Sequence, residues 1–137
     1  MIVRNLVFLC VQNSARSQLA EALARALVAP EVRVWSAGSQ PYRVRPQVRV
    51  VLAELGIDSS GHHSKGLDDV PLDSASLVIT LCAEQVCPAT PGVTVLHWPI
   101  ADPAGEELHD EEERLERFRM TRDEIRARIQ GLLPKLR

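Results

Sequence analysis

Hydrophobic residues along this 137-residue chain recur with two spacings, one typical of strands and the other of amphipathic helices. Continuous or alternating apolar runs predict four strands, at residues 4–10, 31–38, 75–82 and 91–99. Apolar residues three or four positions apart predict three helices, at residues 16–28, 45–56 and 110–133. Residues 56–67, which are rich in Ser, Gly and His, are expected to form a loop.

The order of these segments indicates the fold class. Strands that alternate with helices form βαβ units, and such units build a parallel sheet covered on both faces. Neither a linker nor an internal repeat interrupts the pattern, so we expect one α/β domain over residues 1–137. Ligands bind at the carboxyl ends of the strands in such a sheet, which is where Cys10 and Cys82 both lie.

Composition narrows the class of protein. No apolar run approaches the roughly 18–20 residues of a membrane span, and the N-terminus lacks a signal-peptide pattern, so we expect a cytoplasmic protein with no membrane partner. The formal net charge of −2 argues against a nucleic-acid partner, and it means that an anion site has to be built locally. The three cysteines, an odd number, make a poor disulfide framework.

A candidate anion site follows the first predicted strand. Cys10 ends this strand and Arg16 opens the first helix, so the residues between them, VQNSA, form a tight loop. Such a loop can aim backbone N–H groups at an oxyanion held at the N-terminus of the helix. Arg16 adds a planar fork that grips two oxyanion oxygens. The alternative is a core cysteine that merely precedes a helix with an arginine near its start.

The same positive field favours the thiolate of Cys10, which makes this residue a candidate nucleophile. Ser17 can donate its hydroxyl to that thiolate, and Asn13 tolerates the left-handed backbone that the loop needs. The expected oxyanion-binding residues are Val11, Gln12, Asn13, Ser14, Ala15, Arg16 and Ser17.

These residues resemble the low-molecular-weight tyrosine phosphatase fold, and more closely the thioredoxin-coupled arsenate reductases built on it. The resemblance runs nearly end to end, through the motifs FLCVQNSARSQLAEA, WSAGS, GIDSSGHHSKGL, LVITLC, CP and HWPIADPAG. It implies a three-layer sandwich in which helices flank a four-stranded parallel sheet with the order 2-1-3-4. It also implies arsenate as the substrate, phosphate and sulfate as oxyanion mimics, and thioredoxin as the reductant.

Asp102 is the candidate proton donor for the oxygen that leaves the oxyanion, because it follows the fourth predicted strand on the carboxyl side of the sheet. Beside a bound anion and away from bulk water, its carboxyl would hold a proton tightly, as a general acid requires. The alternative is an Asp that starts a turn before Pro103. The phosphatase relatives have an aromatic residue soon after this acid, whereas this chain has Pro103-Ala104-Gly105, as in the reductases.

The resemblance also implies a relay of three thiols. Cys10 attacks arsenate, Cys82 attacks Cys10 and releases arsenite, and Cys87 moves the disulfide to Cys82–Cys87, which thioredoxin reduces. In a regular helix Cys82 and Cys87 would lie roughly 7.5 Å apart along the axis, at about 1.5 Å per residue. A disulfide needs Cα atoms within about 7 Å. We therefore expect residues 82–92 to form a mobile segment that rearranges on oxidation.

The spacer between Cys82 and Cys87 is shorter than in the usual relatives, which leaves two alternatives open. A small thiol and a glutaredoxin-like partner would open the Cys10–Cys82 disulfide if Cys87 were not the final resolving thiol. A zinc site at Cys82 and Cys87 would need further ligands, but no paired-histidine motif completes it, and we expect no bound metal.

In reductases of this family a potassium ion can lie behind the oxyanion loop, at positions that match Asn13, Glu21 and Ser36. Position 65, where a further acidic ligand is expected, is Lys65 in this chain. Its ammonium can take the place of the cation and pair with Glu21, so we expect no tightly bound cofactor. The alternative is a solvated lysine, in the same polar loop where His62 and His63 are also expected to be solvated.

Two other functions remain open from the sequence. A phosphatase acting on phosphotyrosine or small phosphoesters would use the same loop, but Cys82, Cys87 and the residues after Asp102 argue against it. A non-catalytic oxyanion-binding or redox-sensing module would use Cys10 without turnover, and it would leave the acid and the two further thiols without a role.

Overall fold

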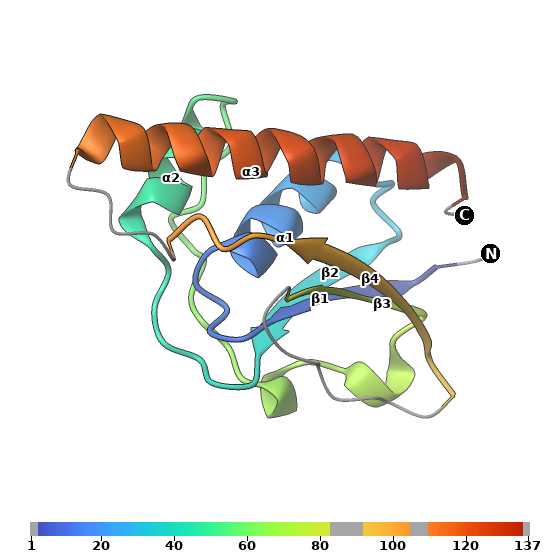
Figure 1. Ribbon diagram of the computed structural model, residues 1–137. Helices are drawn as coiled ribbons and strands as arrows, with labels where there is room; N and C mark the ends of the chain where they lie inside the picture. Colours follow the sequence, from blue (N-terminus) through green and yellow to red (C-terminus); the bar gives the residue numbers. More distant parts are fainter. Residues whose placement is uncertain (1–2, 83–91, 105–109, 136–137) are drawn as a thin grey trace.

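The computed structural model describes residues 3–82, 92–104 and 110–135 (Figure 1). In chain order its elements are β1 (Asn5–Cys10), α1 (Arg16–Leu27), β2 (Arg33–Gly38), α2 (Pro46–Ala53), the 3₁₀ helices η1 (Leu67–Asp69) and η2 (Leu72–Ser74), β3 (Leu77–Cys82), β4 (Thr94–Ile100), α3 (Glu111–Leu132) and the 3₁₀ helix η3 (Leu133–Lys135). Every predicted strand and helix is present, and their ends lie within three residues of the predicted ones. Among the helices of these described ranges, none is both long and apolar enough to cross a membrane.

The four strands form one parallel sheet with the order β2-β1-β3-β4, which confirms the expected topology. Because all strands run the same way, their carboxyl ends meet at one edge of the sheet. Cys10 lies beside Gly38 in the β1–β2 register, and Cys82 lies beside Ile100 in the β3–β4 register. The two strands that end in cysteine are neighbours in the sheet, so Cys10 and Cys82 lie at the same edge.

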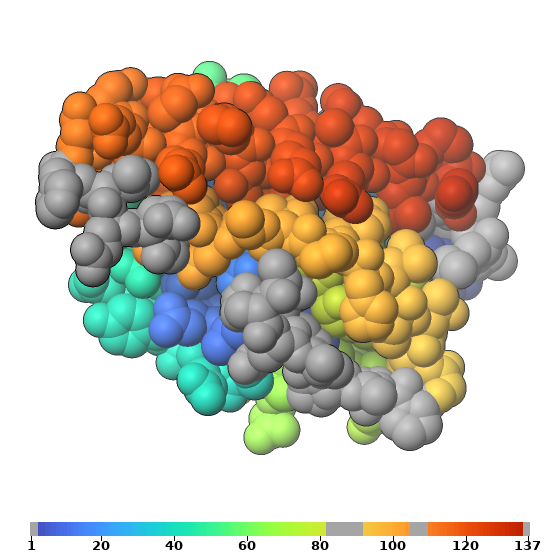
Figure 2. Space-filling model, viewed as in Figure 1, coloured from blue at the N-terminus to red at the C-terminus, as the bar shows by residue number. Residues whose placement is uncertain are grey.

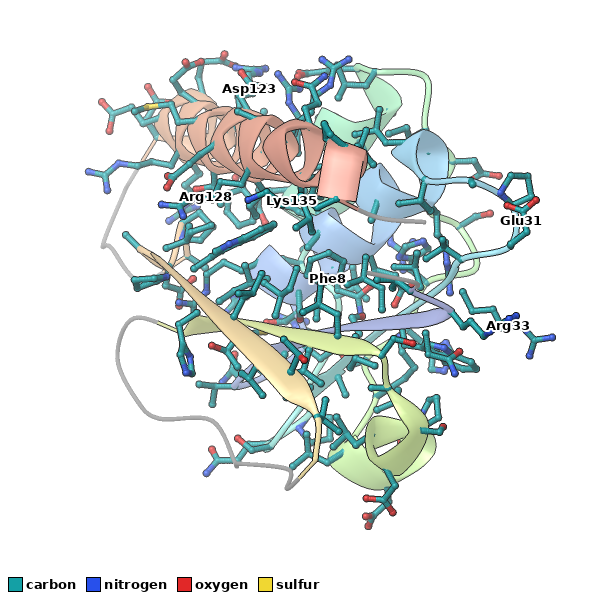
Figure 3. All side chains as sticks on the ribbon, turned by 90° about the vertical axis from the view of Figure 1, so that its right-hand side faces the viewer. Phe8, Glu31, Arg33, Asp123, Arg128 and Lys135 are labelled. Atoms are coloured by element: carbon teal, nitrogen blue, oxygen red, sulfur yellow. The ribbon has the colours of Figure 1, made fainter. Side chains whose placement is uncertain are left out.

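The three α-helices cover one face of the sheet, and η1 and η2 lie on the other face (Figure 1). The larger core fills the space between the sheet and the α-helices, and Phe8 points into it from β1 (Figure 3). Phe118 and Ile125 of α3 are buried against this core, as the helical stripe of the sequence predicts. A smaller core, which includes Val7, Leu9 and Val78, lies on the face toward η1 and η2.

Helix α3 is capped at its start and tied to α2 by charged side chains. Asp110 is the N-cap residue, and its side chain accepts a hydrogen bond from the backbone N–H of Glu112. Glu54, just past α2, pairs with Arg119 at 2.8 Å and with Arg122 at 2.8 Å. The hydrogen bond from Arg119, helped by Arg122, holds the pKa of Glu54 below its ordinary value. These contacts fix α2 and therefore the segment that leads into it.

Candidate active site

The loop from Cys10 to Arg16 joins the carboxyl end of β1 to the start of α1. No side chain among the described residues caps the N-terminus of α1, so the partial positive charge of the helix is directed at the loop. The Cys10 side chain is nearly buried, with 4 % exposure, and its Sγ lies 2.8 Å from Ser17 Oγ. The loop therefore holds the thiol beside a hydroxyl and at a positive helix end, which is the environment expected for a nucleophilic cysteine.

The segment between β2 and α2 holds the loop from outside, and sequence reasoning did not identify it. It passes alongside the loop in Figure 1. Three backbone N–H groups donate to loop carbonyls: Gln40 to Val11 at 2.8 Å, Tyr42 to Gln12 at 3.1 Å, and Arg45 to Ser14 at 2.9 Å. These bonds satisfy three loop carbonyls on the outer side and tie the loop to the segment that leads into α2.

Gly38, at the end of β2, lets this packing occur. A Cβ atom on Gly38 would lie 2.4 Å from the carbonyl oxygen of Val11 and 2.7 Å from the backbone nitrogen of Asn13. No side chain fits at those distances, so the close approach of β2 to the loop needs a glycine.

Arg16 is held by the carboxyl ends of β3 and β4, on the other side of the site. Its Nη1 donates to the carbonyl of Ile100 at 2.9 Å and lies 3.5 Å from the carbonyl of Leu81. The side chain is 4 % exposed. These contacts orient the guanidinium and connect it to β4, the strand that leads directly to Asp102.

A cavity of about 270 Å³ opens in front of the loop. Its wall contains the nucleophile, the loop, two arginines and a carboxylate, contributed by Cys10, Val11, Gln12, Ser14, Ala15, Arg16, Arg45 and Asp102. In Figure 2 the blue atoms of the loop and the start of α1 come to the surface between the cyan segment before α2 and the yellow-orange segment after β4. The cavity has the composition of an oxyanion site.

Asp102 borders the cavity, as expected, but its side chain is exposed. Its Oδ1 accepts a hydrogen bond from the backbone N–H of Ala104 at 2.9 Å. Within the described residues, this carboxylate is exposed rather than sheltered from bulk water as we expected for a general acid, and its hydrogen bond to Ala104 is that of a turn at Pro103.

The side chains of Asn13 and Ser17 lie behind the loop rather than in the cavity wall, and both are fully buried. Asn13 has a φ of 50°, the left-handed backbone expected for it. Its Nδ2 donates to Ser17 Oγ at 2.8 Å and to Ser36 Oγ at 2.9 Å, and its Oδ1 accepts from the N–H of Lys65 at 2.8 Å. Asn13 thus ties the loop to α1, to β2 and to the segment around Lys65.

Glu21 lies at the centre of the polar cluster behind the loop, with 2 % exposure. Ser36 Oγ donates to its Oε1 at 2.5 Å, and Arg25 pairs with its Oε2 at 2.8 Å. Lys65 Nζ lies 3.3 Å from Oε1, the pairing that the sequence suggested. A buried carboxylate needs such compensation, because an unpaired one would be strongly destabilising.

His62 belongs to the same cluster, and its predicted solvation is wrong. Its side chain is only 8 % exposed, and Nδ1 lies 3.0 Å from Gln18 Oε1 and 3.8 Å from Glu21 Oε2. Burial lowers the pKa of His62 below its ordinary value, although the carboxylate of Glu21 acts in the opposite direction. His63 is exposed as expected, so only the tertiary fold distinguishes the two neighbouring histidines.

The remaining predicted thiols are placed only in part. Cys82 ends β3 at the same sheet edge as Cys10. Cys87, and with it most of the segment 82–92 that we expect to rearrange, lies outside the described residues.

Comparisons with known proteins agree with this geometry. The family model for low molecular weight phosphotyrosine protein phosphatase matches residues 5–137. An arsenate reductase of Halalkalibacterium halodurans is 44% identical over 125 residues, covering 89% of each chain. A solved arsenate reductase in its phosphate-binding state superposes with a TM-score of 0.78 at 30% identity, covering 96% of this chain and 98% of that one.

A thioredoxin-dependent arsenate reductase of Corynebacterium glutamicum has a TM-score of 0.74 at 32% identity, and the match covers 97% of this chain and 61% of that one. The family match spans almost the whole sequence and includes the Cys10–Arg16 loop, Gly38 and Asp102. The chain therefore belongs to the low molecular weight phosphotyrosine protein phosphatase family.

Proposed function

We propose that this chain is an arsenate reductase that works by a thiol relay and is regenerated by thioredoxin. The observation that carries the proposal is the buried Cys10 thiol, 2.8 Å from Ser17 Oγ, on the wall of a cavity that also contains Arg16 and Asp102. The three relatives described above are arsenate reductases, and one of them is thioredoxin-dependent. We expect the reaction to take place in the cytoplasm, where thiols are kept reduced.

In the first step the Cys10 thiolate attacks the arsenic atom of arsenate. A sulfur–arsenic bond forms, one arsenic–oxygen bond breaks, and Asp102 donates the proton with which that oxygen leaves as water. Arg16 and the N–H groups of the loop hold the remaining oxygens and stabilise their charge. Asp102 has to exchange protons with solvent between turnovers, and its exposed position allows this.

In the second step Cys82 attacks the sulfur of Cys10. The electron pair of the sulfur–arsenic bond moves to arsenic, so As(V) becomes As(III), arsenite leaves and a Cys10–Cys82 disulfide forms. Cys87 then attacks Cys82 and releases Cys10, and thioredoxin reduces the Cys82–Cys87 disulfide by thiol–disulfide exchange. The neighbouring strands that carry Cys10 and Cys82 end at the same sheet edge, which supports the first exchange.

The cluster behind the loop fits an internal cation better than a potassium ion. Lys65 Nζ already lies 3.3 Å from Glu21 Oε1, and it also donates to the carbonyl of His63 at 3.0 Å. An ammonium in this position supplies the positive charge that would otherwise have to come from a bound metal. We therefore propose that turnover is equal in sodium and potassium buffers of the same ionic strength. Strong activation by potassium would contradict this part of the proposal.

The test of the function is arsenate-dependent oxidation of NADPH in the presence of thioredoxin and thioredoxin reductase. We expect activity for the wild type and its loss in Cys10→Ser, Cys82→Ser and Cys87→Ser. Activity that survives in Cys87→Ser would mean that the relay stops at Cys82 and that a small thiol and a glutaredoxin-like protein carry out the last step.

Two controls separate the proposal from its alternatives. Hydrolysis of a phosphotyrosine analogue, without arsenate turnover with any thiol donor, would replace the proposed function by a phosphatase. Oxidation of Cys10 and Cys82 by peroxide, without any arsenate-dependent flux, would replace it by a redox-sensing module. Loss of flux when arsenate is replaced by sulfate is the expected result for a reductase.

A further inference from the structure

Arg45 contributes a second guanidinium to the wall of the cavity. It is the N-cap residue of α2, and its backbone N–H donates to the carbonyl of Ser14 at 2.9 Å. That bond anchors the residue directly on the oxyanion loop. The residue lines the cavity together with Cys10 and Arg16. It therefore approaches the ligand site from the segment before α2, whereas Arg16 approaches from the start of α1.

The guanidinium of Arg45 has a donor with no partner in the described parts of the chain. Its Nε is buried and makes no hydrogen bond. A buried donor without an acceptor is costly, about 1–3 kcal/mol and more when charged, and such groups are uncommon in native proteins. Arg16, in contrast, donates to the carbonyl of Ile100 at 2.9 Å. On the wall of an anion cavity, the natural acceptor for the Nε–H of Arg45 is an oxygen of the ligand.

The charges around the cavity support the same conclusion. With Cys10 as the thiolate and Asp102 as the protonated acid, Arg16 balances the one negative charge among these side chains of the cavity wall. A dianion would then meet side chains with no net positive charge, in a chain whose formal net charge is −2. Arg45 adds a positive charge locally, which matters because opposite charges attract strongly when they are partly removed from water.

We propose that Arg45 is a second anion-binding arginine, which donates to an outer oxygen of the bound oxyanion and gives the cavity its preference for dianions over monoanions. The inference rests on the proposed function only in taking a tetrahedral oxyanion as the ligand of the cavity. It does not depend on the fate of that ligand, on Cys82 or on Cys87.

The chain contains a matched control for this arginine. Arg43 lies two residues earlier on the same segment, is exposed, and stacks over the ring of Tyr42 at 5.2 Å. It is not part of the cavity wall. Arg43→Gln and Arg45→Gln therefore remove the same charge from the same segment, and only the second removes a donor from the cavity.

The experiment is protection of Cys10 from iodoacetamide by sulfate, a dianion, and by perchlorate, a monoanion of the same shape. Modified Cys10 is quantified by peptide mass spectrometry, which separates it from the other two cysteines. We expect Arg45→Gln to raise the sulfate concentration needed for half protection by about tenfold or more, because a charge-assisted hydrogen bond is lost. The perchlorate concentration needed for half protection is expected to rise less in Arg45→Gln. For Arg43→Gln, the sulfate concentration for half protection is expected to match the wild type within about twofold.

Equal sulfate protection in Arg45→Gln and the wild type would overturn the proposal. An equal loss of sulfate protection in Arg43→Gln and Arg45→Gln would also overturn it, because the loss would then come from the general surface charge. If Arg45→Gln does not fold, as judged by its thermal unfolding, Arg45→Lys replaces it. That variant keeps the charge but loses the Nε–H, so we expect protection several-fold weaker than wild type, and unchanged protection would refute the role. Because the assay measures anion binding, its outcome is independent of whether the chain reduces arsenate.

Discussion

The Gly38→Ala variant tests whether the close packing of β2 against the oxyanion loop controls catalysis. The added Cβ would lie 2.4 Å from the carbonyl oxygen of Val11, whereas ordinary contacts begin at 3.4 Å, so the loop would have to retreat by about 1 Å. The obstacle is backbone rather than a flexible side chain, so it cannot turn away. A displacement of about 1 Å at a reacting group costs about 10²-fold in rate, and overpacking in a core costs about 1–3 kcal/mol of stability.

We expect Gly38→Ala to lower arsenate-dependent turnover by about 10²-fold and to lower the free energy of unfolding, measured with urea, by about 1–3 kcal/mol. Gly61→Ala is the matched control, because a Cβ at Gly61 meets no atom of the residues that the structure describes within 4 Å, and we expect it to behave as the wild type. Normal turnover and normal stability of Gly38→Ala would refute the reasoning, since the loop would then tolerate a shift that we hold to be incompatible with its function.

Three further substitutions test the thiol, the buried histidine and the core. Ser17→Ala removes the hydroxyl 2.8 Å from Cys10 Sγ, and alkylation of Cys10 at neutral pH should slow by about tenfold or more. Burial lowers the folded pKa of His62 below 6.5. Its contribution to stability is therefore present above pH 6.5 and is lost as the pH falls through that lowered pKa. In urea unfolding, the free energy of unfolding of His62→Asn should fall less on acidification than that of the wild type. Phe118→Ala truncates a side chain with 1 % exposure and should cost about 3–5 kcal/mol, whereas Met120→Ala, at a residue with 63 % exposure, should stay within about 0.5 kcal/mol.

Each of these expectations has a result that contradicts it. Unchanged alkylation in Ser17→Ala would mean that the hydroxyl does not stabilise the thiolate. His63→Asn is the control for His62, because His63 is exposed. An identical pH dependence of the free energy of unfolding in both variants would mean that the burial of His62 does not cause it. Equal costs at Phe118 and Met120 would contradict the placement of α3 against the core.

The fold could be predicted because its signals are local. The strand and helix periods are strong and alternate regularly, and parallel strands joined by helices leave few topologies open. The loop from Cys10 to Arg16 could be predicted for the same reason, since a strand end, a short turn and a helix start are contiguous in the sequence. The exact sheet order and the pairing of Lys65 with Glu21 followed from the family resemblance rather than from the local pattern.

The rest of the site depends on contacts between segments that are distant along the chain. Nothing in the local pattern around Arg45 shows that it reaches the wall of the Cys10 cavity, or that its segment pairs with the loop carbonyls. The burial of His62, next to the exposed His63, arises because the 56–67 loop packs against α1, and the exposure of Asp102 depends on how the chain leaves β4. Periodicity specifies which face of an element is buried, but only the packing of elements specifies which side chains meet at the edge of the sheet, because that depends on distances between residues that the sequence does not place near one another.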